Sequence, residues 1–285
     1  MKKVDPYYWE YRNTLEAIAL RLLNDHCPDG PPFDPFRIAE ALKVGVRLAH
    51  LDGLDGYVEF KEKEKCYAVL PVNGNPARKR FTLSHELGHV VLFRAGPKGV
   101  PKLKRYRTTA FRPSEHHDPI EESLCDDFAT QLLMPFGEFQ DRLRKYGVHP
   151  LSIFNLAREF DVSIQAAVVR TRQVLRKRFV SCSFWDLKAP WPVPRWWVGK
   201  KTRRVAELSR LEMLVRHDEQ TDELWKCYNG SKYTVRVQIS HRARGALALV
   251  LVSTCFQQAD SRSKVLGGDQ KQDRQLELFG FPATS

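Results

Sequence analysis

Two histidines four residues apart, His85 and His89, limit what this chain can fold into more than any other feature of its sequence. On an α-helix, residues with that spacing share one face, so both imidazoles can reach a single metal ion. Glu86 lies beside them, where its carboxylate can hold the water that the ion polarises. The segment therefore predicts a helix that carries a metal site and a general base together. The alternative is a buried helix whose two histidines are bonded internally.

The flanking sequence favours a helix that is buried over most of its surface. Asn75 suits the N-cap and Pro76 the first helical position, where a missing N–H costs nothing. Residues 81–93 are largely apolar, and Gly96 begins a Gly-Pro stop signal. Gly88 lies inside this helix, at a cost of roughly 1 kcal/mol relative to alanine. We expect this glycine to let another element approach the site closely.

A catalytic zinc site usually takes a third protein ligand, which a second helix can supply. The segment 118–134 predicts such a helix, with Asp118 at its N-cap and a proline after its end. Glu121 completes a capping box with Asp118, which leaves Glu122 as the ligand candidate. Asp126 shares a helix face with Glu122 and can orient a ligand histidine. The alternative is that both carboxylates belong to a solvated stripe.

Several motifs in order resemble the ImmA/IrrE metallo-endopeptidases. They are RFTLSHELGH at 80–89, ESLCD at 122–126 and LLMP at 132–135. Ser84 stands where alanine is usual, and Cys125-Asp126 stand where Ala-Asn is common; neither change touches a ligand. The resemblance covers about the first 175 residues. It implies a zinc-type site, with manganese as the alternative metal, in which His85, His89 and Glu122 are ligands and Glu86 is the base.

The same resemblance implies a narrow protein substrate. The expected substrate is a helix-turn-helix repressor, cut to derepress phage, mobile-element or stress-response genes. An oxyanion donor is expected near the site, and Tyr106, His116 and His117 are the candidates in the intervening loop. The rival function is a non-catalytic regulator that binds DNA or a repressor and uses the metal structurally. Retention of Glu86 separates the two, because a structural site needs no base.

The fold class expected is α+β, with a zincin-like helical peptidase domain and a small antiparallel sheet beside the active helix. Helices are predicted at 7–26 and 36–42, and strands at 44–48, 56–60 and 66–72. Such a sheet gives an extended substrate a strand edge to join. The domain division expected is 1–148 for the peptidase, 149–178 for a helix-turn-helix-like pair, 179–256 for an α+β domain and 257–285 for a tail.

The segment 156–163 resembles the turn of a helix-turn-helix, with Asp161 in place of glycine and Ser163 as the cap of the second helix. A helix that reads DNA needs polar side chains at its start. Residues 164–169 are instead largely apolar, so packing against the peptidase unit is favoured over DNA reading.

The C-terminal half predicts a small α+β unit. Radiation-response members of the resembled family carry a sensor-like domain at their C-terminus, and this chain is long enough for one. A helix is expected at 203–215, and strands at 224–228, 233–239 and 245–255. Asn229-Gly230 is a hairpin signal between the first two strands. Five of the six tryptophans lie in this half and form either its core or a ligand pocket.

The polar tail is expected to be flexible and ends in a short apolar motif made of Gln275, Leu276, Leu278 and Phe279. This motif is similar to the peptide with which bacterial proteins bind the replication sliding clamp. The alternative is that the tail packs on the body of the chain.

Composition narrows the class of protein. Forty-six lysines and arginines against 34 aspartates and glutamates give a net charge of +12, concentrated in three runs that are either solvated faces or DNA contacts. Six scattered cysteines without a C-x-x-C pair favour neither a cysteine zinc site nor a disulfide framework. No apolar signal segment or membrane span is apparent. A cytoplasmic location without membrane contact is therefore expected.

Overall fold

The computed structural model describes residues 6–61, 65–95, 119–176, 179–186, 193–199, 221–226, 232–242 and 245–254. Several predicted features lie outside these residues: the oxyanion candidates Tyr106, His116 and His117, the helix at 203–215, and the tail motif. The chain divides into two compact units. The first contains residues 1–138 and 158–163, and the second contains 139–157 and 164–285.

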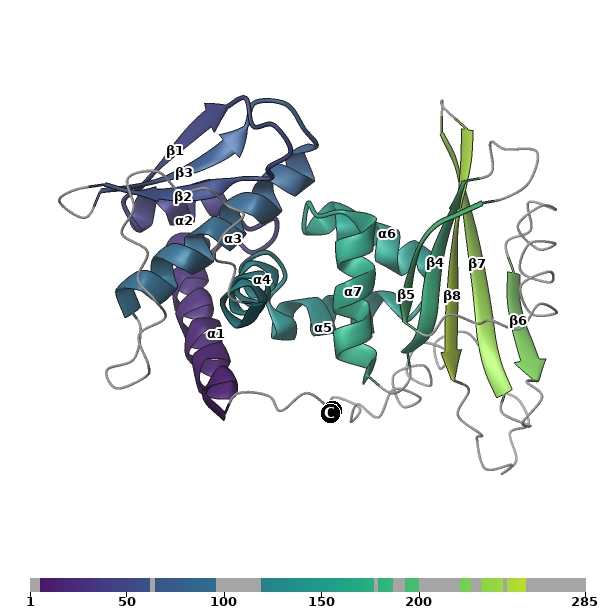
Figure 1. Cartoon of the computed structure of the whole chain (residues 1–285). Helices are drawn as coiled ribbons and strands as arrows, with labels where there is room; N and C mark the ends of the chain where they lie inside the picture. Colours follow the sequence, from purple (N-terminus) through teal and green to yellow (C-terminus); the bar gives the residue numbers. More distant parts are fainter. Residues whose placement is uncertain are drawn as a thin grey trace. The chain divides into compact units, whose positions relative to one another are not determined.

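Four helices form most of the first unit: α1 (Pro6–His26), α2 (Pro35–Ala41), α3 (Pro76–Ala95) and α4 (Pro119–Leu133) (Figure 1). The predicted N-cap of α3 is confirmed, because the Asn75 side chain accepts a hydrogen bond from Ala77 N at 2.9 Å. Asp34 caps α2 in the same way through Phe36 N, also at 2.9 Å. Each cap satisfies a backbone N–H that has no partner inside its helix.

The small sheet contains β1 (Val44–Ala49), β2 (Tyr57–Phe60) and β3 (Cys66–Pro71), in the order β1-β3-β2. The prediction of an antiparallel sheet is wrong for one of its two pairs. β2 and β3 pair antiparallel, whereas β1 and β3 pair parallel. The reason is that the connection at 50–56 carries β2 past the place beside β1, which β3 then fills. α3 contacts β3, the central strand, and lies along one face of the sheet (Figure 1).

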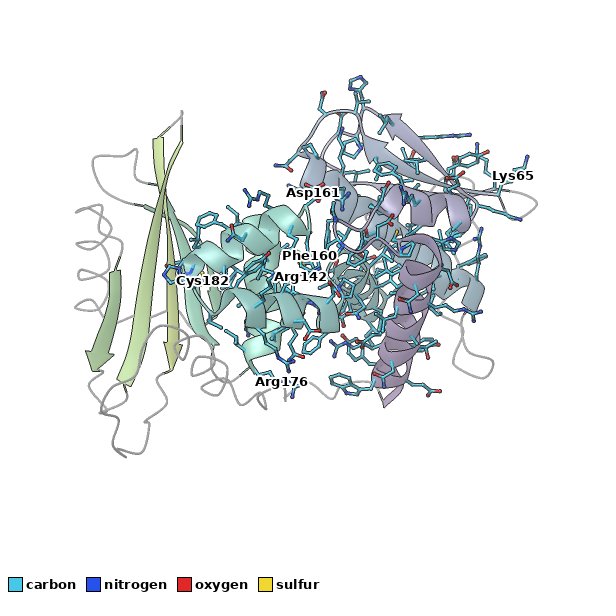
Figure 2. The ribbon with its side chains drawn as sticks, turned by 180° about the vertical axis from the view of Figure 1, so that it is seen from behind. Lys65, Arg142, Phe160, Asp161, Arg176 and Cys182 are labelled. Atoms are coloured by element: carbon cyan, nitrogen blue, oxygen red, sulfur yellow. The ribbon has the colours of Figure 1, made fainter. Side chains whose placement is uncertain are left out.

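The turn of the helix-turn-helix-like pair belongs to the first unit. Asp161 has a φ of 49°, the left-handed conformation that glycine usually takes in this position. Its carboxylate lies 3.2 Å from Nε of Arg80 on α3. The preceding Phe160 is fully buried and its ring contacts that of Phe33, with centroids 6.3 Å apart; Figure 2 labels both turn residues. These contacts concern the turn alone, and packing of the two helices against the peptidase unit stays a prediction.

The second unit contains a helical part and a five-stranded sheet. Its helices are α5 (Phe136–Tyr146, whose first three residues belong to the first unit), α6 (Pro150–Glu159) and α7 (Ile164–Leu175). Its strands are β4 (Phe179–Asp186), β5 (Val193–Gly199), β6 (Thr221–Lys226), β7 (Lys232–Arg242) and β8 (Gly245–Thr254).

The strands of the second unit follow the order β5-β4-β8-β7-β6, and every neighbouring pair is antiparallel. α7 contacts β4 and β5. The three predicted strands correspond to β6, β7 and β8, and β6 pairs antiparallel with β7. The predicted turn at Asn229-Gly230 lies outside the described residues. β4 and β5 were not predicted. The α+β class is confirmed for the described residues.

Four cysteines lie in the described part of the chain, and all four are buried free thiols: Cys27, Cys66, Cys125 and Cys182. Among the described helices, none combines the length and apolar character that crossing a membrane requires.

Candidate metal centre

Helix α3 brings its two histidines to one point. The Nε2 atoms of His85 and His89 lie 3.2 Å apart, and the ring centroids are separated by 5.0 Å. Leu83, Leu87 and Val90 on the same helix are completely buried. Burial of these apolar side chains fixes the rotation of α3, so that the imidazoles turn toward α4.

Helix α4 places Glu122 against both imidazoles. One carboxylate oxygen of Glu122 lies 3.2 Å from Nε2 of His85, and the other lies 3.6 Å from Nε2 of His89. Two imidazole nitrogens and a carboxylate from separate helices therefore converge, as the sequence predicted. Nitrogen and oxygen donors in a group of three are the ligands of catalytic zinc sites, so this donor set fits such an ion.

The opposite ring nitrogens also have carboxylate partners. Nδ1 of His85 lies 2.9 Å from Oδ1 of Asp126, the residue predicted to orient a ligand histidine. Nδ1 of His89 lies 2.9 Å from Oε1 of Glu121. The sequence interpretation missed this second contact, because it assigned Glu121 to a capping box with Asp118, which lies outside the described residues. The one sequence signal for this contact is the order of the residues along the two helices. His89 follows His85 in α3, and its partner Glu121 precedes Asp126 in α4.

Gly88 allows the two helices to approach closely. A Cβ atom at this position would lie 3.1 Å from Cα and 3.2 Å from Cβ of Cys125 on α4. Such contacts are tighter than ordinary van der Waals packing. The role predicted for Gly88 is confirmed, and its helical cost is offset by the approach of α4 that brings Glu122 within reach.

Glu86 is almost completely buried, with 6% of its surface exposed. Gly56, which directly precedes β2, lies beside it: a Cβ on Gly56 would come within 2.5 Å of the Thr82 side chain and 3.5 Å of Oε1 of Glu86. Burial raises the pKa of Glu86, although His89 and His85 act in the opposite direction. A carboxylate whose pKa is raised by burial is a stronger base than an exposed carboxylate with the usual pKa.

Carboxylates near the cluster favour positive charge on His85. Burial alone would lower the pKa of His85, but hydrogen bonds with Asp126 and Glu122 outweigh this effect and raise the pKa to about 10. The carboxylates that stabilise the protonated ring would also attract a divalent cation in place of that proton.

A second donor set overlaps the first. Ligand atoms of His85, His89 and Cys125 lie within 4.8 Å of one another. Burial, together with the acidic neighbours Glu121 and Glu122, raises the pKa of the Cys125 thiol and keeps it protonated. A bound metal ion would itself deprotonate a coordinating thiol, so Cys125 stays a candidate donor. Glu122 is the third ligand of the proposal below because its two oxygens face the Nε2 atoms of both histidines.

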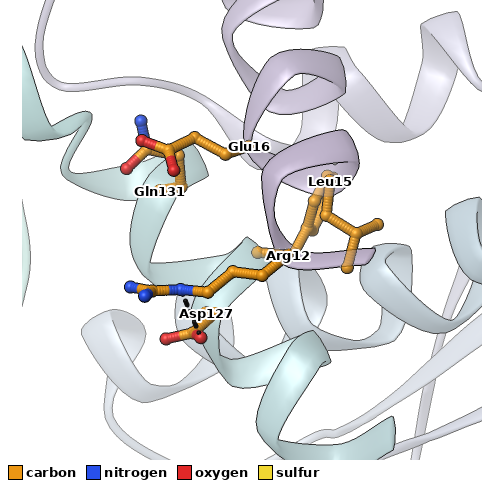
Figure 3. Close-up of a pocket in the computed structure, with 6 residues that line it drawn as sticks. Arg12, Leu15, Glu16, Asp127 and Gln131 are labelled. Atoms are coloured by element: carbon orange, nitrogen blue, oxygen red, sulfur yellow. Dashed lines mark ion pairs between the residues drawn. The ribbon is translucent and has the colours of Figure 1, made fainter. Parts of the chain in front are cut away.

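Helix α1 also contacts α4, through Asp127. Nε of Arg12 and the hydroxyl of Tyr8 each lie 2.9 Å from the carboxylate of Asp127. Figure 3 shows the ion pair at a pocket between these helices. The pocket is lined by Arg12, Leu15, Glu16, Asp127, Phe128 and Gln131, none of which belongs to the histidine cluster. Asp127 directly follows Asp126, so this anchor also fixes the backbone next to the partner of His85.

The side-chain cluster is of the kind that zinc peptidases use, and sequence comparison adds a family match for part of the chain. Residues 40–172 match the family described as the IrrE N-terminal-like domain. The match covers 133 of the chain's 285 residues, and this part of the chain is similar to the ImmA/IrrE metallopeptidases.

Two relatives carry the name radiation response metalloprotease IrrE. The protein from Deinococcus deserti is 30% identical over 136 residues, which cover 41% of this chain and 43% of the relative. The protein from Deinococcus radiodurans is 31% identical over 93 residues, which cover 33% of this chain and 26% of the relative. The matches thus span less than half of either relative.

A solved structure shares the fold. A Mycobacterium tuberculosis transcriptional regulator superimposes with a TM-score of 0.52 over 87% of this chain and 78% of its own length. The two sequences are 13% identical, so this likeness concerns the fold alone.

Proposed function

We propose that this chain is a metal-dependent endopeptidase in which His85, His89 and Glu122 hold a zinc-type ion. The observation that carries the proposal is the convergence of the two Nε2 atoms and the Glu122 carboxylate, with separations of 3.2 and 3.6 Å. The metalloprotease names of the two IrrE relatives support it. Zinc suits this donor set, and manganese is the alternative ion.

Glu86 is the general base of the proposed reaction. When bound, the ion would polarise the scissile carbonyl and acidify a water molecule. The Glu86 carboxylate accepts the proton of the attacking water and later donates it to the leaving amide nitrogen. Its burial excludes bulk water, which would otherwise weaken its hydrogen bonds with the reacting groups.

The edge of β2 is suited to hold the substrate. β2 is the last strand in the order β1-β3-β2 among the described residues. Gly56 brings its start beside Glu86. An extended peptide that pairs with this edge would pass the base along its backbone, as in other strand-addition complexes.

The substrate that we propose is a helix-turn-helix repressor, whose cleavage derepresses phage, mobile-element or stress-response genes. This choice follows from the resemblance of the motifs to the ImmA/IrrE endopeptidases. We place the reaction in the cytoplasm, where such a repressor acts. DNA and the sliding clamp are not included, because the turn at 160–163 is occupied by packing contacts and the tail lies outside the described residues.

We further propose that the functional division follows 1–148 for catalysis, 149–178 for the helical pair, 179–256 for regulation and 257–285 for a tether. The family match at 40–172 spans most of the first part and continues into the helical pair. The regulatory role of the C-terminal sheet rests on the resemblance to the sensor-bearing members.

The direct test compares wild type with Glu86→Gln, using a repressor encoded beside this chain as substrate. We expect Glu86→Gln to lower the cleavage rate by about 10²–10⁴-fold, because it removes the proton acceptor. Metal content should stay unchanged, since Glu86 is not among the proposed ligands. Equal cleavage by both proteins would overturn the assignment, and would favour the non-catalytic regulator.

A further inference from the structure

Each imidazole of the cluster is held from two sides. The Nε2 atoms face Glu122, whereas the Nδ1 atoms face different carboxylates. Asp126 serves His85, and Glu121 serves His89, both at 2.9 Å. The second contact is the one that the sequence did not predict, and neither the base nor the three ligands account for it.

A carboxylate at Nδ1 has a defined effect on a ligand histidine. It accepts the Nδ1–H, which selects the tautomer whose Nε2 lone pair is free to bind a metal. It also fixes the rotation of the ring, so that the lone pair points toward the ion. A His89 ring without this partner would have to order itself when the metal binds, and the affinity would fall accordingly.

Glu121 is better sheltered than the equivalent partner of His85. Its side chain is 24% exposed, whereas the side chain of Asp126 is 60% exposed. A hydrogen bond shielded from water is electrostatically stronger than one that solvent screens. The residue that directly precedes Glu122 therefore makes the more protected of the two orienting contacts.

A purely structural role for Glu121 makes a different prediction. Glu121 lies in the first turn of α4, where a negative charge interacts favourably with the helix dipole. That role requires the charge but not a side chain of a particular length. The contact with His89 requires an acceptor at a particular distance, and a neutral amide oxygen can also accept the Nδ1–H.

We propose that Glu121 is a positioning residue that orients His89 for metal binding. This role rests on the proposed metal site. It predicts that metal affinity depends on the reach of the side chain at position 121 more than on its charge.

Two substitutions separate reach from charge. Glu121→Gln keeps the length of the side chain and an acceptor oxygen but removes the charge. Glu121→Asp keeps the charge but withdraws the carboxylate by one methylene. Glu40→Gln, at an exposed position on α2, is the control for loss of a negative charge elsewhere in the first unit.

The measurement is the dissociation constant of zinc for the metal-free full-length chain, in competition with a chromophoric chelator. We expect Glu121→Asp to weaken zinc binding by about 10–100-fold, the range typical of lost outer contacts to metal ligands. Glu121→Gln should weaken it less than Glu121→Asp, and Glu40→Gln should leave it unchanged. In ¹⁵N NMR spectra of the zinc-loaded proteins, the Nδ1–H resonance of His89 should persist in the Gln variant and broaden in the Asp variant.

If Glu121→Gln weakened zinc binding more than Glu121→Asp, the positioning role would be overturned. A helix-dipole effect depends on the charge, which Gln removes and Asp keeps. Equal affinities in all four proteins would overturn it as well. If wild type itself binds no zinc, the metal site of the proposed function fails and the positioning role fails with it. The wild-type titration thus distinguishes the two failures.

Discussion

Two helix pairs in this chain carry recognisable motifs, and their motif residues are used in opposite ways. In α3 and α4, the polar residues of the motifs turn toward one another and form the cluster around His85 and His89. In α6 and α7, the motif position at the turn is Asp161, which contacts Arg80, while its neighbour Phe160 is buried in the first unit. The comparison teaches that a motif indicates a function only when its distinctive side chains face a place where a ligand can bind.

The largest effect that tests this comparison concerns the third ligand. We expect Glu122→Ala to weaken zinc binding on the order of 100-fold or more, because one of three proposed ligands is lost. Cys125→Ala restores the small residue usual in the family and should change the affinity by less than about threefold, since the thiol is not among the three proposed ligands. Zinc content after dialysis, measured by atomic emission, checks both. The opposite pattern would show that His85, His89 and Cys125 form the true donor set.

A smaller effect tests the close approach of α3 and α4. Gly88→Ala puts a methyl group 3.1 Å from Cα of Cys125 on α4, closer than ordinary van der Waals contact, whereas Gly137→Ala meets no atom within 4 Å. Alanine favours both helices equally, so the two variants should differ by the overpacking term alone, about 1–3 kcal/mol in the free energy of unfolding. Urea unfolding of the two variants measures this difference. Equal stabilities would mean that α4 can move away without cost.

The smallest effect is expected at the turn of the second pair. Asp161→Gly restores the residue usual in such turns and relieves a left-handed backbone. It also removes an ion pair with Arg80 whose carboxylate side is 54% exposed, and exposed pairs contribute little. These terms oppose each other, so the free energy of unfolding should change by less than about 1 kcal/mol. A loss above about 2 kcal/mol would show that the ion pair dominates the turn.

The cluster of histidines and carboxylates was largely predictable because short stretches of sequence indicate it. The spacing of His85 and His89 places them on one face, and the Asn75 cap and the flanking apolar residues define the helix. Glu122 and Asp126 follow from their own spacing on the next helix. Glu121 was missed for a physical reason: whether an acidic side chain in a first turn faces its own backbone or a neighbouring helix depends on how the helices cross.

The sheets were predictable only in part. β1, β2 and β3 have clear strand patterns, but the patterns do not say which strand lies in the middle, so the parallel pairing of β1 and β3 was not expected. β4 was missed because neighbouring residues Cys182 and Ser183 are both buried. A strand covered on both faces lacks the alternation that reveals a half-exposed strand.

The first unit is built from two stretches of chain, residues 1–138 and 158–163. A fragment that stops before the second stretch would leave the Phe33 ring without Phe160 and Arg80 without Asp161. Expression fragments intended to carry the metal cluster should therefore extend beyond Ser163. For the same reason, the two fragments produced by a protease that cuts between the two stretches should stay associated through these contacts.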